Sequence, residues 1–418
     1  MRAKWRGVEY HNEVEFHIGS NAQEALYRNR NFLLLWCGQF VSQMGDRIAA
    51  VALPWLVYRH TGSALGTGLV LALYTLPYVL LGTIAGVLVD RVNKRTLMML
   101  TDAARGLLML AVPLLAEVSL VAVYVLAFMV ASLAVLFDPA KLAIVPEIVS
   151  APRLLRANSL LSTAENVTEV VGYGFAGILL ASVSTLTAFR IDALTYAGSA
   201  AALAFMAYHP AHHAIPSRAR SVAQDARDAL LYLGNHRGLL ANTLISVAAA
   251  AGAGATYPLI FLFAVRELDG GPKAFGYLEA ALGLGFFIGS LALAGAARRV
   301  RKGTTMIVGL TLTGTGVVLM ALTTSMWSAA AVLLLVGVVN ASALIAIDTF
   351  VQEAVPERLR GRVWGTRLTL TQGTYALAVL VTGGFAGIID LRTLFVISGA
   401  LIAVPALVGA FVEEIRRG

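Results

Sequence analysis

Long hydrophobic runs separated by short polar segments make up most of this chain. Twelve of these runs reach about 20 residues or more, which is the length a helix needs to cross the ~30 Å hydrocarbon core of a bilayer. Because lipid offers the backbone no hydrogen-bond partner, each run predicts a membrane-spanning α-helix. The predicted spans are 32–58, 64–89, 97–116, 119–145, 157–181, 187–208, 239–265, 274–297, 304–323, 327–351, 363–389 and 393–412.

The composition indicates a membrane protein and excludes an ordinary soluble enzyme. Of the 418 residues, 58% are hydrophobic and 13% are charged, whereas soluble domains carry roughly 25% charged residues. The mean hydropathy is +0.75. A single cysteine, Cys37, excludes a disulfide framework. Residues 1–31 are polar and contain no apolar core of a signal peptide, so we expect a cytosolic tail.

Basic residues gather on alternate loops and so predict the orientation. Most of the 32 Lys and Arg lie in the tail and in every second loop, and the other loops hold few, namely Arg59, Arg266, Lys273 and Arg392. By the positive-inside rule both termini are cytosolic. We therefore expect a multi-pass protein of the cell inner (plasma) membrane. The net charge of +8 is then explained by topology, and no nucleic-acid partner is expected.

A polar segment at 209–238 divides the predicted spans six against six, and its helical spacing of apolar residues suits a surface helix. Val145–Val149 and Gly174–Gly177 recur half a chain later as Val351–Val355 and Gly384–Gly387. We predict a tail at 1–31, a six-helix bundle at 32–208, a linker at 209–238, a second bundle at 239–412 and a tail at 413–418. The linker histidines show no metal-site spacing, so no metal is expected.

The segment Gly86–Arg95 resembles the signature of the major facilitator superfamily in the loop between helices 2 and 3. Asn93 stands where Gly is usual, and we expect it to keep the left-handed turn. The resemblance implies an all-α membrane protein with twelve transmembrane helices in two parallel six-helix halves. It also implies a cytosolic gate in which Asp90 pairs with the other half, with a residue set of Gly86, Asp90, Arg91, Lys94, Arg95, Arg360 and Arg362.

A second set of motifs is more specific. Phe137–Glu147, Gln352–Val363, Gly45–Arg47 and Ala52–Trp55 resemble the macrolide-efflux and enterobactin-exporter branch of this superfamily. That branch implies export of drugs or siderophores, mostly by proton antiport. The chain lacks an arginine at 119–136 and has Gly172-Tyr173 where Gly-Pro is frequent. A facilitator without proton coupling therefore stays an alternative.

Charged residues inside the spans are functional candidates, because each costs about 2.5 to 3.5 kcal/mol at a helix centre on insertion scales. Glu165 and Glu169 lie one turn apart, and burying both would favour protonation of one. The alternative is an ion-pair cluster that only locks helices together. Asp192, Glu279 and Asp348 are expected nearer span ends, hydrated or structural. The residues expected near the midplane, for proton coupling or substrate binding, are Asp46, Arg47, Arg105, Glu165 and Glu169.

The remaining cavity lining is expected to be apolar with a few polar side chains, namely Asn166, Tyr257, Gln372 and Tyr375. Phosphate-binding loops, zinc-binding helices and nucleophile elbows are absent from the sequence, so neither an enzyme nor a cofactor is predicted. The sequence predicts a monomeric, proton-coupled secondary exporter of amphipathic small molecules that works by alternating access. Alternatives are a siderophore or lipid-like substrate, or a receptor that transports nothing.

Overall fold

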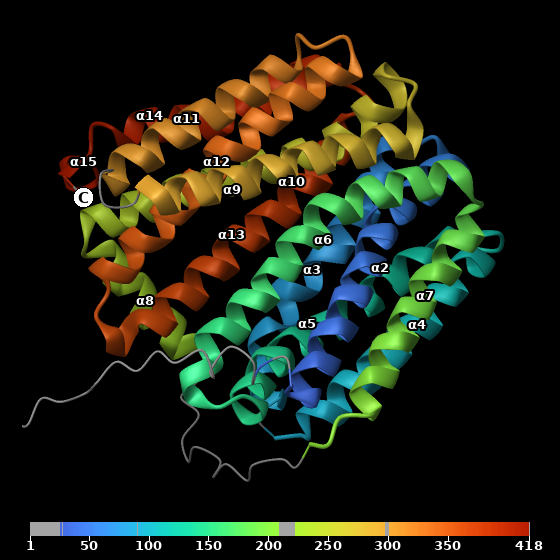
Figure 1. Cartoon of the computed structure of the whole chain (residues 1–418). Coiled ribbons are helices and arrows are strands. Elements are labelled where there is room, and N and C mark those ends of the chain that lie inside the picture. The colour runs from blue at the N-terminus through green and yellow to red at the C-terminus, as the bar shows by residue number, and fades with distance from the viewer. Residues whose placement is uncertain (1–25, 27, 90, 209–221, 297–300, 418) are drawn as a thin grey trace, which may run out of the picture.

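The computed structural model describes residues 26, 28–89, 91–208, 222–296 and 301–417 (Figure 1). In these residues the chain is helical, with twelve helices of 19 residues or more. They are α2 (Arg30–Thr61), α3 (Ala64–Val89), α4 (Lys94–Ala116), α5 (Leu120–Ile148), α6 (Leu154–Ser182), α7 (Thr185–Ala204), α9 (Arg237–Leu262), α10 (Gly271–Ala296), α11 (Lys302–Met320), α12 (Met326–Ala354), α13 (Glu357–Phe385) and α14 (Leu391–Gly409).

Short elements join or end these helices. η1 (Ala151–Arg153) precedes α6, and the π-helical turn η2 (Phe263–Glu267) extends α9. The linker contains α8 (Val222–Gly234), and α15 (Glu413–Arg417) follows α14. The all-α membrane fold is therefore confirmed.

Eight helices of the described chain are long and apolar enough to cross a membrane: α3, α4, α5, α9 with η2, α10, α11, α12 and α14. The other four long helices, α2, α6, α7 and α13, carry charged or amide side chains within their length. Their packing among the eight places them in the same bundle. The prediction of twelve spans thus rests on composition for eight helices and on packing for four.

Polar side chains at the turns fix where several helices begin. Ser184 and Asp390 accept hydrogen bonds from first-turn amides of α7 and α14, which satisfies donors that a helix start leaves open. Asn93 does the same for α4, with φ −67° and ψ 111°. The expected left-handed turn at Asn93 is therefore wrong, because the side chain is used as a cap. Gly62, with φ 62°, ends α2 in the left-handed conformation.

The helices pack as two groups of six that share two long contacts. α2 to α7 form one group, the N-half, and α9 to α14 form the other, the C-half. Between the groups, α6 packs on α10 and α3 packs on α13. Figure 1 shows the N-half in blue to green and the C-half in yellow to red. The exact domain boundaries given above stay a prediction.

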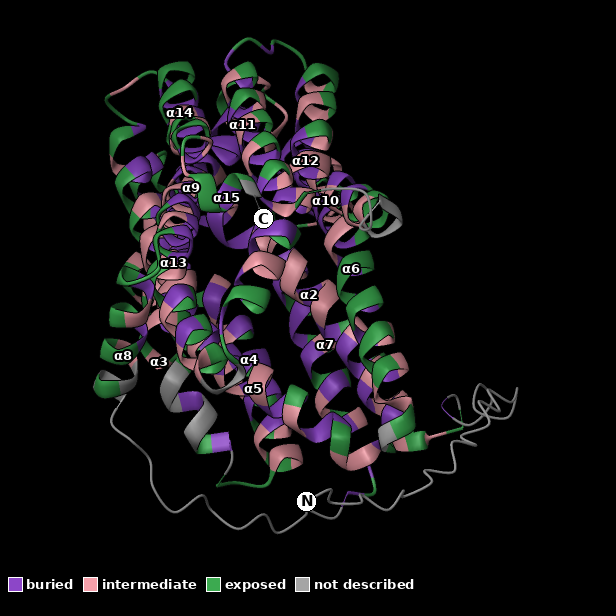
Figure 2. Cartoon of the chain, turned by 90° about the vertical axis from the view of Figure 1, so that its left-hand side faces the viewer, coloured by how far each residue is buried: buried purple, intermediate pink, exposed green. Residues whose placement is uncertain are grey.

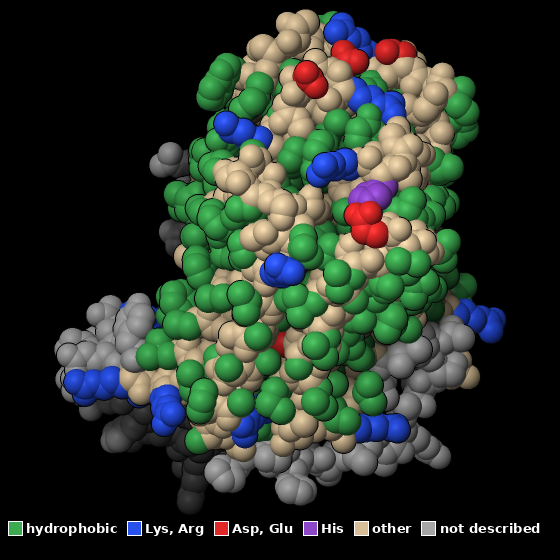
Figure 3. Space-filling model, turned by 90° about the vertical axis from the view of Figure 1, so that its right-hand side faces the viewer, with side chains coloured by type: hydrophobic (Ala, Val, Ile, Leu, Met, Phe, Trp, Pro, Cys, Tyr) green, Lys and Arg blue, Asp and Glu red, His purple; other side chains and the backbone are tan. Residues whose placement is uncertain are grey.

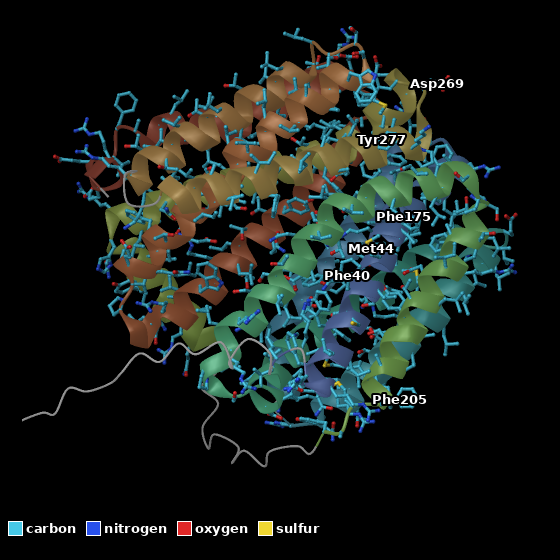
Figure 4. The ribbon with its side chains drawn as sticks, in the orientation of Figure 1. Phe40, Met44, Phe175, Phe205, Asp269 and Tyr277 are labelled. Carbon is cyan, nitrogen blue, oxygen red and sulfur yellow. The ribbon has the colours of Figure 1, made fainter. Side chains whose placement is uncertain are left out.

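The bundle has two ends that differ in their contacts. The linker end carries α8 and the starts of α2, α4 and α6, and the hairpin end carries the short turn after α2 and the one after η2. Figure 4 shows Phe205 at the linker end and Asp269 at the hairpin end.

At the hairpin end the halves touch through glycines. A Cβ built on Gly383 of α13 would lie 2.7 Å from the Cα of Gly68 in α3, and one on Gly276 of α10 would lie 2.7 Å from the Cα of Gly177 in α6. Small residues let membrane helices approach this closely.

Arg266 of η2 adds polar contacts at the same end. Its Nε donates to the Tyr58 hydroxyl at 3.0 Å, and its Nη2 donates to the Gly62 carbonyl at 3.3 Å. Since Tyr58 and Gly62 belong to the N-half, Arg266 ties the two halves together. The hairpin end is therefore sealed by backbone packing and by this arginine.

The outer surface suits contact with lipid. Leu107, Leu114 and Leu291 are more than 60% exposed, and Figure 3 shows hydrophobic side chains spread over one face of the molecule. Figure 2 shows buried positions turned toward the interior of the bundle. A multi-pass membrane protein follows from these features.

Candidate substrate cavity

A cavity of about 900 Å³ lies between the two halves. This volume is at the upper end of the range for small-molecule sites. The N-half contributes most of the wall, through α2, α3, α5 and α6, and the C-half contributes Tyr257, Tyr375 and a stretch of α10. Because the hairpin end is sealed, the cavity is separated from that end of the bundle.

Most of the predicted cavity residues line this space. They are Asp46, Arg47, Arg105, Glu165, Asn166, Glu169, Tyr257 and Tyr375. Gln372, which lies one turn before Tyr375, is half-buried and is not among the lining residues. Their roles in coupling or binding stay predictions.

Asp46 lies at the centre of a polar cluster within the N-half. Its Oδ1 accepts from Arg105 Nη2 at 2.6 Å and also from the Tyr196 hydroxyl. The Arg105 guanidinium lies 4.3 Å from the centre of the Tyr196 ring, which adds a cation–π contact. Helices α2, α4 and α7 are thus joined by one ion pair and one tyrosine.

Two further acids surround this cluster. Asp102 Oδ1 is 3.7 Å from Arg105 Nη1, as expected from residues that share a face of one helix. Asp192 is completely buried, and neither of its carboxyl oxygens has a hydrogen-bond partner. Of the two expectations for Asp192, hydrated or structural, the hydrated one is therefore wrong. Gly45 of α2 explains the burial, since a Cβ there would clash with Asp192 and Thr195 of α7.

A second ion pair lies where α2, α6 and α10 meet. Arg47 Nη2 is 2.8 Å from Glu169 Oε2, and its guanidinium lies 5.3 Å from the centre of the Tyr173 ring. Glu279 of α10 lines the same part of the cavity and is 5% exposed. Its Oε1 has no hydrogen-bond partner. Of the same two expectations for Glu279, the hydrated one is also wrong.

A third ion pair joins α5 to α6. Lys141 Nζ is 2.8 Å from Glu165 Oε1. The Glu165 and Glu169 side chains are 47% and 42% exposed, so the two acids are not buried together. Although one turn apart, they pair with bases from different helices. Lys141 is a cavity cation that the sequence analysis missed, on the helix that lacks an arginine at 119–136.

Other lining residues were missed as well. Tyr78 donates to Asp138 Oδ2 at 3.2 Å, and Thr168 donates to Gln43 Oε1 at 3.1 Å. Gln39 and Tyr74 also line the cavity. Amide and tyrosine side chains in the middle of apolar spans were the available signal, and Asp138 and Lys141 lie inside a motif that the sequence analysis used only for resemblance.

Acids outnumber bases in the cavity wall. Its basic residues are Arg47, Arg105 and Lys141, each paired with an acid. Two lining acids, Asp138 and Glu279, have no basic partner within salt-bridge distance in the described part of the chain. The wall therefore carries an excess of acidic groups. Across the described residues no group of His, Cys, Asp or Glu is arranged to hold a metal.

Lys94, Arg95 and Arg362 of the predicted gate lie at the linker end, and each contacts a residue of its own half. Lys94 Nζ is 2.9 Å from Glu147, and Arg95 Nε donates to the Leu203 carbonyl at 2.7 Å, both inside the N-half. Arg362 Nη1 is 3.4 Å from Asp228 of α8.

Among the other predicted gate residues, the structure describes the side chains of two. Arg91 and Arg360 are exposed. Gly86 belongs to α3, and Asp90 lies outside the described residues. The proposed pairing of Asp90 with the other half thus stays a prediction.

Comparison with known proteins places the chain among transporters. A family model described as Transmembrane secretion effector matches residues 22–416. The chain is 26% identical over 398 residues to the multidrug efflux pump Tap of Mycolicibacterium fortuitum, covering 92% of this chain and 96% of that protein. It is 23% identical over 403 residues to Macrolide efflux protein A of Streptococcus pyogenes, with coverages of 92% and 96%.

Solved structures agree on the fold. A bacterial homologue of the iron transporter ferroportin, solved in an inward-facing state, matches with a TM-score of 0.72 at 16% identity, covering 94% of this chain and 100% of that one. At such a low sequence identity, the structural match supports only the fold. Since the family model spans nearly the whole sequence, the chain belongs to the Transmembrane secretion effector family, within the drug-efflux branch of the major facilitator superfamily of transporters.

Proposed function

We propose that this protein exports amphipathic small molecules, coupled to proton influx, by alternating access between its two halves. The observation that carries the proposal is the cavity of about 900 Å³ between the halves, where acidic groups outnumber basic ones along a wall that mixes apolar, tyrosine and amide side chains. A site of this kind suits drug-sized molecules that combine an apolar body with a positive charge. The names of the relatives, multidrug and macrolide efflux pumps, support the same substrate class.

Alternating access needs a seal that forms at one end while the other end opens. In this structure the seal is at the hairpin end, and the gate residues of the linker end make contacts within their own halves. We propose that the opposite state closes the linker end, with Asp90 bridging the halves. The termini are then cytosolic, and the protein acts as a monomer in the inner membrane.

Proton coupling requires a carboxyl group whose protonation changes with the state of the cavity. Asp46, Glu165 and Glu169 each hold a cation here, so protonating one of them would release its partner. The ion pairs are thus candidate switches. A facilitator without coupling would use the same pairs only to hold its helices together.

An anionic siderophore is the second candidate substrate. It would need Arg47 or Arg105 as its counter-charge, and both arginines are engaged by acids of the same half. The geometry therefore favours cationic over anionic substrates.

The test is substrate-dependent proton movement in proteoliposomes that contain the purified protein and a pH-sensitive dye. The panel holds ethidium and tetraphenylphosphonium as cations, chloramphenicol as a neutral compound and enterobactin as an anion. We expect an imposed pH gradient to drive uptake of the cations and an uncoupler to abolish it. Uptake that ignores the gradient would identify a facilitator, and selective uptake of enterobactin would establish the second candidate.

A further inference from the structure

Glu279 is the most deeply buried acid that lines the cavity. It lies in α10 of the C-half, is 5% exposed, and leaves Oε1 without a hydrogen-bond partner. An ionised carboxylate in such surroundings is costly unless a cation accompanies it. The Glu279 carboxyl group therefore needs either a proton or a nearby cation.

The charged groups that act on Glu279 in the described structure belong to the other half. Glu279 interacts electrostatically with Glu169 of α6 and Arg47 of α2. Glu169 reaches α10 directly, because a Cβ built on Gly283, one turn after Glu279, would lie 3.5 Å from its Cγ. Arg47 Nη2 is bonded to Glu169 at 2.8 Å, and Arg47 Nε is buried without a partner. Glu169 holds the Arg47 guanidinium, and no base of the described residues lies within salt-bridge distance of Glu279, which leaves room for one further positive charge.

Aromatic side chains complete the surroundings of Glu279. Tyr173 of α6, Tyr257 of α9 and Tyr375 of α13 line the same cavity as Glu279. Tyr173 already carries a cation on its ring, the Arg47 guanidinium at 5.3 Å. Tyrosine faces attract organic cations in the same way. From α12 and η2, which also pack on α10, the described interactions of Glu279 include no charged group.

We propose that Glu279 binds either a proton or the positive charge of an organic cation, but not both, and that this competition is the exchange step of transport. The proposal rests on the proposed function and names the site of coupling within it. In the empty cavity the Glu279 carboxyl holds a proton. When the cation enters between the tyrosines, that proton passes to cavity water, and it returns when the cation leaves, so the charge of the cluster is constant.

The test measures binding to purified protein in detergent, where no gradient is present. The probe is radiolabelled tetraphenylphosphonium, whose own charge does not change with pH. We expect wild-type affinity to fall at least tenfold from pH 8 to pH 5.5, because protons occupy the site at low pH. We also expect about one proton to be released per cation bound at intermediate pH, measured in weakly buffered solution. Chloramphenicol, which is neutral, should bind with little pH dependence.

Glu279→Gln removes the titratable group at nearly constant shape. It should weaken tetraphenylphosphonium binding at pH 8 at least tenfold, remove its pH dependence and leave chloramphenicol binding within about twofold of wild type. Glu279→Asp should restore part of the pH dependence. The matched control is Glu117→Gln, since the Glu117 side chain is 78% exposed at the hairpin end of α4 and should leave every value unchanged.

Several results would overturn the proposal. They are wild-type binding that releases no proton, absence of tetraphenylphosphonium binding at pH 8, or a Glu279→Gln protein that keeps the wild-type pH dependence. The first and third would leave the proposed export function intact. Conversely, a wild type that transports nothing in vesicles removes the proposed function while the binding data still decide the role of Glu279. If Glu279→Gln fails to fold, proton release by the wild type and the Glu279→Asp profile decide it.

Discussion

At the scale of single residues, the cavity charges are organised by what each acid pairs with. Asp46 is 26% exposed on its side chain while its partner Arg105 is 6% exposed, so the arginine depends more on the pair than the aspartate does. Removing one member of a buried ion pair leaves the other charge uncompensated, and this costs more than removing both. Asp102, 3.7 Å away, offers Arg105 only a weaker substitute.

The ion pair between Asp46 and Arg105 gives a prediction for two variants, Asp46→Asn and Arg105→Gln. Each single variant should lower the melting temperature of the purified protein, with losses in the range of about 3 to 5 kcal/mol for a broken buried pair. The double variant should be more stable than the sum of the two losses implies. Thermal unfolding followed by tryptophan fluorescence would measure the coupling. Strictly additive effects would show that the pair contributes nothing to folding.

The sequence predicted these residues but not their partners. Placing a charged side chain inside a membrane span costs free energy whatever surrounds it, so the sequence alone identifies such residues as unusual. They are Asp46, Arg47, Arg105, Glu165 and Glu169. Which charged residues pair with each other depends on how each helix is rotated about its axis. The sequence gives little indication of that rotation, because a span that faces lipid on one side and protein on the other is apolar on both sides. That is why Glu165 pairs with Lys141 and Glu169 with Arg47, although they share a helix face.

At the scale of helices, the thickness of the membrane makes the spans predictable from the sequence. The places where helices cross are harder to predict. The hydrophobic runs agree with the observed helices because every helix must cover the same thickness of hydrocarbon. The contacts that seal the hairpin end depend on single glycines at helix crossings, such as Gly68 against Gly383. Other glycines, such as Gly82 and Gly387, take part in no such crossing, since a Cβ there would meet nothing within 4 Å.

The crossing of α3 and α13 carries a prediction about the seal. Gly383→Ala puts a methyl group 2.7 Å from the Gly68 backbone, so the hairpin end should open more readily. A reporter cysteine at Ala64, which is 3% exposed at this crossing, in a Cys37→Ser background should then react faster with a membrane-impermeant maleimide. Gly387→Ala is the matched control. Equal labelling rates in both variants would contradict the role of this crossing.

Arg266 supports the same seal by a different interaction, which gives an independent prediction. Arg266→Gln loses the charged contacts to Tyr58 and the Gly62 carbonyl, so it should also speed labelling at the Ala64 reporter. Combined with Gly383→Ala, the effect should exceed that of either change alone. Arg59→Gln, which removes a neighbouring exposed charge at the same end, should leave the rate unchanged. A rate unaffected by Arg266→Gln would mean that backbone packing alone closes this end.

At the scale of the whole molecule, two six-helix groups share only two long contacts and a polar linker. α8, the described part of that linker, packs against α13 and α9, so it belongs with the C-half. The half-chain repeat predicted this division, because one copy of the motif lies in the first six helices and the other copy lies in the last six.

Cutting the linker therefore tests whether the halves are held by packing or by the covalent connection. Fragments 1–215 and 216–418 should associate when they are co-expressed, because the α6–α10 and α3–α13 contacts remain available. Affinity purification through a tag on 216–418 should recover the untagged 1–215, and the pair should regain measurable uptake of tetraphenylphosphonium. Gly276→Leu in the C-terminal fragment should prevent recovery, since a side chain there would meet the Tyr173 carbonyl and the Gly177 backbone. Two fragments that both insert but never associate would show that the linker, and not helix packing, holds the halves in one transporter.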